Sequence, residues 1–577
     1  MEIIARLANL PGALPGACAQ GLIWGIMAIG VYLTYRILDV ADLTVDGSFG
    51  TGGAVCVMCL LSGMNVWLAL LVAVLAGLAT GLVTGLLHTF MGIPAILAGI
   101  LTQLALYSIN LKIMGKANQS INVDKYGLLI SLRWVKEFAL HNPIIMIILV
   151  TAVVIGVLYW FFGTELGCAI RATGSNPAMS RAQGINTNFN IVLGLAVSNA
   201  LVALSGALLS QYQGFADVGM GRGAIVIGLA AVIIGEAVFG RIFHNFALKL
   251  VSVSIGAIIY YVVIQLVLTL GFTQTCSSCS ALLWWPCSWP CRTGRANTSR
   301  SRSKRHRRRM QKMLEIQNVS KTFNAGTVNQ KTALNGLNLK LNEGDFVTVI
   351  GGNGAGKSTM LNAVAGVWPV DEGKILIDGV DVTRLSEHQR AAYIGRVFQD
   401  PMTGTAATMQ IEENLALAAR RGKRRTLRIG ITKAEREQYR ELLKTLDLGL
   451  EDRLTARVGL LSGGQRQALT LLMATMNKPK LLLLDEHTAA LDPKTALKVL
   501  TLSAKIVEEN HLTTMMITHN MKDAIKYGNR LIMMYEGHII YDVSGEEKKN
   551  LHVSDLLAKF QIASGGEFAN DRMILSN

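Results

Sequence analysis

The chain has 577 residues, of which 51% are hydrophobic and only 16% are charged, a composition too apolar for an ordinary soluble enzyme. The formal net charge of +16 is concentrated in one stretch, because ten Lys or Arg and no acid lie between Arg292 and Lys312. Residues 47–111 contain no Asp, Glu, Lys or Arg, whereas the residues after 313 are rich in both signs and contain no Cys. The composition therefore predicts a membrane half followed by a soluble half, and it argues against a disulfide framework.

Long apolar stretches predict the helices of the membrane half, since a span needs about 20 mostly apolar residues. The stretch 47–111 has room for three spans, broken near Ser62–Asn65 and near Gly92–Pro94. The remaining candidates are 17–35, part of 143–164, 187–216, the stretch that begins at 250, and the shorter 223–235, which is either a span or a re-entrant piece. We expect a polytopic α-helical membrane domain of about eight or nine spans.

Two polar stretches interrupt this half. Residues 163–186 lie between two predicted spans and combine small residues with Arg171 and Arg181; by residue type alone they fit any loop between helices. In residues 43–53, Asp46 opens an apolar span. We favour a helix N-cap for this Asp over a carboxylate on a solute path.

The soluble half contains a P-loop. Residues 347–359 run from an apolar strand into the pattern G-x-x-x-x-G-K-S, whose main-chain N–H groups cradle the phosphates of a nucleotide. Lys357 is expected to reach the β- and γ-phosphates, and Ser358 to hold Mg²⁺. The predicted nucleotide-binding residues of this loop are Gly351, Asn353, Gly354, Ala355, Gly356, Lys357, Ser358 and Thr359.

A second motif follows at 481–489, where an apolar strand ends in two acids. Asp485 is placed to support Mg²⁺, and Glu486 to polarise the attacking water. The alternative is a buried strand that merely ends in Asp-Glu, and the P-loop upstream argues against it.

The residues 460–467 are more specific. They spell L-L-S-G-G-Q-R-Q, the signature of ATP-binding cassette (ABC) ATPases, and residues 313–545 resemble that family throughout. The resemblance implies an α/β P-loop NTPase domain of the ABC ATPase type, with no motif missing. Its further matches are Gln399 of the Q-loop, Asp492 of the D-loop, His519 as the switch histidine and Phe323 as the aromatic residue that stacks on adenine.

The resemblance also implies a mechanism. Two such domains dimerise head to tail, and the P-loop of one and Ser462, Gly463, Gly464 and Gln465 of the other enclose each ATP. The implied catalytic residues are Glu486, His519 and Gln399, and the implied Mg²⁺ positions are Ser358, Gln399 and Asp485. Closure on ATP and opening after hydrolysis would move the membrane helices.

The membrane half then becomes interpretable. Residues 15–271 resemble permeases of ABC importers in the branched-chain amino acid and simple-sugar class, and the stretches 35–55 and 100–115 are most similar to a branch of that class thought to import amino-acid-like solutes. In that family the 163–186 loop is a cytoplasmic coupling helix that docks near the Q-loop. We therefore expect ATP-driven import of a small, amino-acid-like solute across the bacterial cytoplasmic membrane, with the ATPase on the cytoplasmic side.

The expected partners are a second copy of the chain, a separate extracytoplasmic solute-binding protein, the solute and membrane lipid, with no nucleic acid. Two alternatives are an ABC exporter, and a non-transporting ABC ATPase whose membrane half is an anchor. The predicted domains are a permease at 1–272, a linker at 273–312 and an ATP-binding domain at 313–577.

The linker is compositionally odd. It holds Cys276, Cys279, Cys287 and Cys291, but only seven residues separate the two Cys pairs, which is short for a zinc module. In a frame displaced by one base, every Cys or Trp codon of this stretch becomes Leu, Met or Val, which would give a further apolar span. We favour the hypothesis of a frameshifted permease C-terminus over a genuine basic linker, and the underlying DNA sequence decides between them.

Overall fold

The computed structural model describes residues 10–123, 125–136, 142–243, 245–270 and 312–563. The predicted linker therefore lies almost wholly outside the described residues. The chain divides into two compact units. The helical unit comprises residues 1–174 and 187–292, and the α/β unit comprises residues 175–186 and 293–577.

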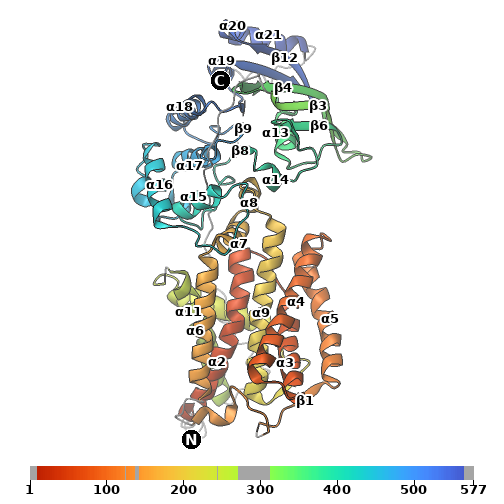
Figure 1. The fold of residues 1–577 in the computed structure, drawn as a ribbon, viewed down its shortest axis with the longest axis vertical. Coiled ribbons are helices and arrows are strands. Elements are labelled where there is room, and N and C mark those ends of the chain that lie inside the picture. The colour runs from red at the N-terminus through yellow and green to blue at the C-terminus, as the bar shows by residue number, and fades with distance from the viewer. Residues whose placement is uncertain (1–9, 124, 137–141, 244, 271–311, 564–577) are drawn as a thin grey trace. The chain divides into compact units, whose positions relative to one another are not determined.

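The helical unit contains nine α-helices in its described residues (Figure 1). They are α2 (Leu10–Tyr32), α3 (Val45–Leu61), α4 (Val66–Thr89), α5 (Ala95–Met114), α6 (Pro143–Phe162), α7 (Glu165–Ser175), α9 (Thr187–Gln213), α10 (Ala224–Phe239) and α11 (Phe246–Thr269). A π-helical turn, Leu33–Leu38, continues α2. A small antiparallel ladder joins β1 (Asn118–Ser120) to β2 (Phe215–Asp217).

Six described helices are long and apolar enough to cross a membrane, and α3 and α10 are shorter apolar helices. The three spans predicted within 47–111 correspond to α3, α4 and α5, with their breaks at the predicted Ser62–Asn65 and Gly92–Pro94. The short stretch 223–235 forms the 16-residue α10. The prediction of a polytopic helical domain is confirmed.

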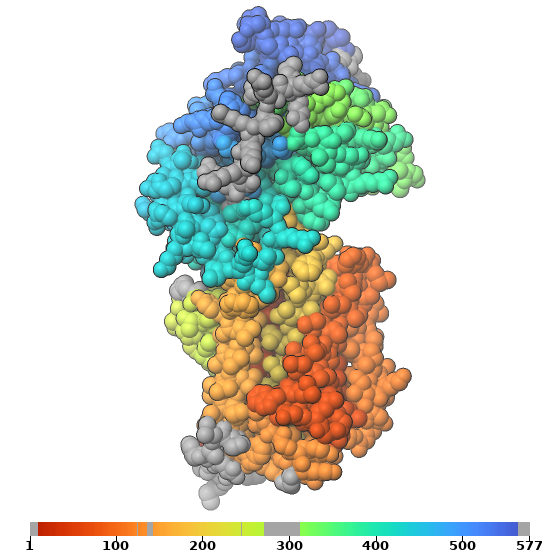
Figure 2. Space-filling view, in the orientation of Figure 1, coloured from red at the N-terminus to blue at the C-terminus, as the bar shows by residue number. Residues whose placement is uncertain are grey.

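Small residues allow the helices to approach closely. Glycines at Gly77, Gly81 and Gly85 repeat every four residues along the face of α4 that packs on α9. A Cβ added at Gly81 would lie 2.3 Å from the main-chain oxygen of Leu195. Close backbone contact of this kind is how helices associate in lipid, where burying apolar side chains gives no advantage. Apolar side chains of α4, α5 and α6 are exposed, among them Leu71, Leu104 and Val157, and atoms of these helices lie at the surface in orange in Figure 2.

Asp46 corrects one prediction. It lies in the first turn of α3, whose N-cap is Thr44 without a side-chain hydrogen bond. The Asp46 carboxylate instead accepts hydrogen bonds from the main-chain N–H of Gly223 at 2.9 Å and of Ile225 at 3.0 Å. Asp46 therefore caps the N-terminus of α10, so the predicted capping role is right in kind but wrong in the helix that is capped.

The α/β unit is built around two sheets. Its strands are β3 (Lys312–Phe323), β4 (Lys331–Asn342), β5 (Phe346–Ile350), β6 (Glu372–Ile377), β7 (Val380–Asp381), β8 (Ile394–Val397), β9 (Leu481–Asp485), β10 (Thr514–Ile517), β11 (Arg530–Tyr535) and β12 (His538–Ser544). Its helices are α8 (Pro177–Ala182), α13 (Lys357–Ala365), α14 (Glu387–Arg390), α15 (Ile411–Ala419), α16 (Lys433–Lys444), α17 (Gly463–Thr475), α18 (Pro493–Asn510), α19 (Met521–Lys526), α20 (Glu546–Lys549) and α21 (Val553–Ala563).

The larger sheet has the strand order β12-β11-β5-β10-β9-β8 and is parallel except at β12. Strands β8, β9 and β10 are buried along their whole length, as expected for a parallel sheet covered on both faces. The smaller sheet, β4-β3-β6-β7, is antiparallel. This is the α/β architecture that the sequence predicted.

Candidate functional site

Three neighbouring parallel strands end at one edge of the larger sheet. β9, β10 and β5 are adjacent and end at Asp485, Ile517 and Ile350. The segments that follow them therefore meet at this edge, where ligands bind in open α/β sheets. These segments are the P-loop after β5, Glu486 after β9 and His519 after β10.

The P-loop has the backbone of a phosphate cradle. Gly351 and Gly356 have φ angles of 154° and 95°, and a Cβ at these positions would lie 2.3 Å from the oxygen of Met534 and 2.5 Å from that of Ala333. Gly356 is the N-cap of α13, and the N-terminus of a helix favours an anion. The Lys357 ammonium donates to the main-chain oxygens of Gly351 at 2.7 Å and Gly352 at 3.1 Å. The loop therefore fits the phosphates of a nucleotide.

The Glu486 carboxylate joins two other predicted catalytic residues. It accepts a hydrogen bond from the Gln399 amide at 3.0 Å, and its other oxygen lies 2.7 Å from Nε2 of His519. Glu486 is buried and has a positive φ of 42°, a strained conformation for a side chain of this size. The residues predicted as general base, switch histidine and Q-loop amide are thus brought together.

Asp485 is the carboxylate predicted to support a divalent cation. Burial raises its pKa, and the neighbouring Arg396 guanidinium, 3.7 Å away, opposes that rise. Carboxylate and hydroxyl oxygens are the protein ligands that suit Mg²⁺, so Asp485 and Ser358 would hold it together with Gln399. Mg²⁺ would neutralise charge on the phosphates during hydrolysis.

The signature residues begin α17. Ser462 and Gln465 form a capping box in which each side chain bonds the main chain of the other. A Cβ at Gly464 would lie 2.1 Å from the side chain of Thr495, whose N–H is capped by Asp492. Hydrogen bonds from Thr495 lower the pKa of Asp492. The signature and D-loop helices therefore pack together, and the Gln465 amide donates to Leu448 rather than to the P-loop.

Phe323, predicted to stack on adenine, packs edge-to-face against Trp368 with 4.9 Å between ring centroids. The predictions did not include Trp368. They also missed His487, which directly follows Glu486, is fully buried and lies 2.9 Å from the Ser503 hydroxyl on α18. Burial lowers the pKa of His487 to about 4, so the imidazole is neutral at pH 7.

Residues 175–186, which we call the coupling segment, pack within the α/β unit. The Asn176 amide donates to the main-chain oxygens of Met402, Thr403 and Thr405, a stretch that begins soon after Gln399. Arg425 donates to the oxygens of Gln183 and Gly184. The contacts agree with the docking near the Q-loop that the family resemblance implied.

The helical unit holds a buried polar cluster that the sequence analysis missed. The Asp42 carboxylate accepts hydrogen bonds from the N–H of Thr44 and from the Asn199 amide on α9. Asn199 in turn accepts from Ser48, which bonds Thr80 on α4. The signal was present, because Asn199 is an amide within a charge-free predicted span, but the residues meet only through helix packing.

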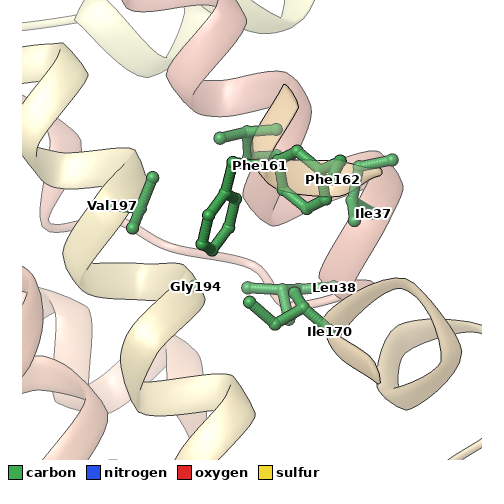
Figure 3. A pocket seen from close by; sticks show the side chains of 8 residues that line it. Ile37, Leu38, Phe161, Phe162, Ile170, Gly194 and Val197 are labelled. Carbon is green, nitrogen blue, oxygen red and sulfur yellow. The ribbon is translucent and has the colours of Figure 1, made fainter. Parts of the chain in front are cut away.

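An apolar pocket lies elsewhere in the helical unit (Figure 3). It is lined by Leu33, Ile37, Leu38, Phe161, Phe162, Ile170, Gly194 and Val197. This lining offers no polar side chain to hold the charged groups of an amino acid, so we do not assign it to a solute.

Two family models match the chain. The model described as branched-chain amino acid transport system / permease component matches residues 14–282. The ABC transporter model matches residues 334–489.

Curated relatives match the two halves separately. The tyrosine transport ATP-binding protein of Clostridioides difficile (strain R20291) is 44% identical over 251 residues, which are 44% of this chain and 100% of the relative. The tyrosine transport system permease protein of the same strain is 38% identical over 260 residues, which are 44% of this chain and 83% of the relative. A solved dimeric ATP-binding cassette, MJ0796 bound to ADP and Pi, is 32% identical with a TM-score of 0.36 and covers 40% of this chain and 98% of its own.

Replacing Glu486 by Gln tests the site directly. The amide cannot accept a proton, so we expect ATP hydrolysis to fall about 100-fold or more, while ATP binding persists because the P-loop is unchanged. Phosphate release and binding of a fluorescent ATP analogue measure the two properties. Unchanged hydrolysis would remove Glu486 from the role of general base.

The burial of His487 predicts a pH dependence of stability. The pKa of His487 is lowered from 6.5 to about 4 on folding. Its contribution to the free energy of unfolding is therefore complete above pH 6.5 and is lost as the pH falls from 6.5 towards 4. The loss should be about 2 kcal/mol at pH 5. Thermal unfolding at pH 7.5 and pH 5 measures it.

The matched variants are His487→Gln, which should show a smaller loss between the two pH values, and His511→Gln, which alters an exposed histidine and should behave like the parent. An equal loss in all three chains would contradict a neutral buried His487.

Proposed function

Because this chain belongs to the ABC transporter family, we propose that it couples ATP hydrolysis to the import of a small amino-acid-like solute across the bacterial cytoplasmic membrane. The observation that carries this proposal is the pairing of its relatives. The helical half and the α/β half each match a protein of a tyrosine transport system, and both relatives come from one strain. The proposed solute class is accordingly that of tyrosine and related amino acids.

The ATPase residues have separate proposed roles. Glu486 takes a proton from the attacking water. His519 and Gln399 both contact the Glu486 carboxylate; they hold that carboxylate in place and respond to the position of the phosphate. Lys357 and the main-chain N–H groups of the P-loop hold the phosphates. Phe323 supports the adenine ring.

Two copies of the chain are proposed to act together. In each ATP site, the P-loop of one copy meets Ser462, Gly463, Gly464 and Gln465 of the other. The N-terminus of the 13-residue α17 presents main-chain N–H groups suited to a phosphate. A separate binding protein would deliver the solute, and the α/β unit would lie on the cytoplasmic side, where ATP is available.

Both interpretations of residues 273–312, a basic linker and a frameshifted permease C-terminus, are retained. The permease model reaches residue 282, and the two relatives are separate proteins. Both observations support the hypothesis that the chain joins what are elsewhere two polypeptides, either through a linker or through a frameshifted permease C-terminus.

Inside-out membrane vesicles that contain the full chain test the direction of transport. The vesicles are preloaded with radiolabelled tyrosine and trapped periplasmic proteins, and ATP is added outside, where the α/β unit faces. An importer should release the label on ATP addition, and the Glu486→Gln chain should release none, because hydrolysis drives the movement.

Each alternative has its own signature in the same vesicles. An exporter would instead accumulate tyrosine from the outer solution. A membrane-anchored, non-transporting ATPase would hydrolyse ATP without moving label in either direction. Release of preloaded leucine or lysine in place of tyrosine would retain import but change the solute class.

A further inference from the structure

We propose that Arg181, Glu387, Arg396 and Asp485 form a chain of ion pairs through which the coupling segment sets the Mg²⁺ affinity of the ATPase site. The inference rests on the proposed function, since it supplies a route from the permease-linked segment to the metal position. All four residues belong to the α/β unit.

The four charges alternate in sign and contact one another in order. Nε of Arg181 lies 3.0 Å from Oε2 of Glu387. The other carboxylate oxygen of Glu387 lies 3.8 Å from one terminal nitrogen of Arg396. The second terminal nitrogen of Arg396 lies 3.7 Å from Oδ2 of Asp485. Each inner residue therefore presents a different atom to each neighbour.

Burial makes these charges sensitive to one another. The side chains of Arg396, Glu387 and Asp485 are 7%, 8% and 12% exposed, whereas that of Arg181 is 40% exposed. Charges removed from water are screened far less than surface pairs, and their interaction is stronger at low effective dielectric. A change at Arg181 therefore alters the electrostatic interactions of Arg396 and Asp485 as well as those of its direct partner Glu387.

Arg396 is the central residue. It lies on β8, next to β9, and its guanidinium donates to the Asn362 side chain at 2.6 Å and lies 4.5 Å from the centre of the Phe398 ring. Its Nε has no hydrogen-bond partner among the described residues. The 3.7 and 3.8 Å separations are longer than hydrogen bonds, so the cation is shared between two carboxylates rather than fixed to one.

The sharing predicts an alternating effect on the metal position. When Glu387 attracts the Arg396 guanidinium more strongly, the Asp485 carboxylate is more available to a cation. When that attraction is weaker, Arg396 neutralises more of the charge of Asp485. Because Arg181 competes for Glu387, withdrawing Arg181 frees Glu387 to hold Arg396. Displacement of the coupling segment would thus raise the affinity for Mg²⁺.

Docking of the coupling segment does not depend on this chain of ion pairs. Asn176 of the segment donates to three main-chain oxygens, Arg425 donates to two main-chain oxygens of the segment, and the Thr408 hydroxyl bonds Ser175 at 3.0 Å. A role limited to attachment would make Arg181 one contact among several. Thr408→Val supplies the matched control, since it removes an attachment outside the ion-pair chain.

The test is equilibrium binding of Mn²⁺, a paramagnetic substitute for Mg²⁺, to the full chain in lipid nanodiscs with a non-hydrolysable ATP analogue. Loss of the free Mn²⁺ signal in electron paramagnetic resonance gives the dissociation constant, and competition by Mg²⁺ confirms the site. We expect this constant to fall about threefold for Arg396→Gln and to rise about threefold for Glu387→Gln.

The constant should fall about twofold for Arg181→Gln and stay unchanged for Thr408→Val, while Arg181→Gln should add nothing to Glu387→Gln because its partner is gone. If Arg396→Gln does not fold, the variant of the half-exposed Arg181, alone and combined with Glu387→Gln, still tests the proposal. Shifts of one sign in all variants, or an additive double variant, would overturn the proposal.

The vesicle experiment separates this inference from the proposed function. Alternating Mn²⁺ shifts without ATP-dependent tyrosine movement would refute import but keep the ion-pair chain. Tyrosine release without alternating shifts would refute the ion-pair chain alone.

Discussion

The ATPase centre depends on one constraint, the alignment of β9, β10 and β5 as adjacent parallel strands that end at the same edge of a buried sheet. That alignment brings the P-loop, Glu486 and His519 together although they are far apart in the sequence. The Gln399 amide and the His519 ring then converge on the Glu486 carboxylate. The proposed metal position and the P-loop lie at the same edge.

The coupling segment connects this centre to the rest of the chain. Residues 175–186 pack within the α/β unit, yet they are covalently flanked by residues 165–174 of α7 and by α9, which belong to the helical unit. Helix α9 packs on α2, α3 and α4, and the Asn199 amide on α9 holds the buried Asp42 carboxylate. The segment is therefore covalently continuous with α9, and this continuity is the physical basis for the coupling that we propose.

The sequence predicted local features well and tertiary contacts poorly. Charge-free stretches located α3, α4 and α5, and fixed spacings identified the P-loop and the signature residues, because these features depend on residues close in the chain. Asp46 was assigned to the wrong helix, since its partners at Gly223 and Ile225 approach only after folding. Arg396, Glu387 and His487 escaped notice for the same reason: their partners lie on other elements.

The most direct test of the account is complementation between two defective chains, because each ATP site is proposed to combine two copies. Lys357→Ala disables the P-loop and Ser462→Arg the signature, so each variant alone should hydrolyse no ATP. When both are co-expressed, half of the dimers are mixed and each has one intact site of two, which predicts about a quarter of the parent activity. No recovery on co-expression, or full activity of the Ser462→Arg chain alone, would contradict an ATP site shared between copies.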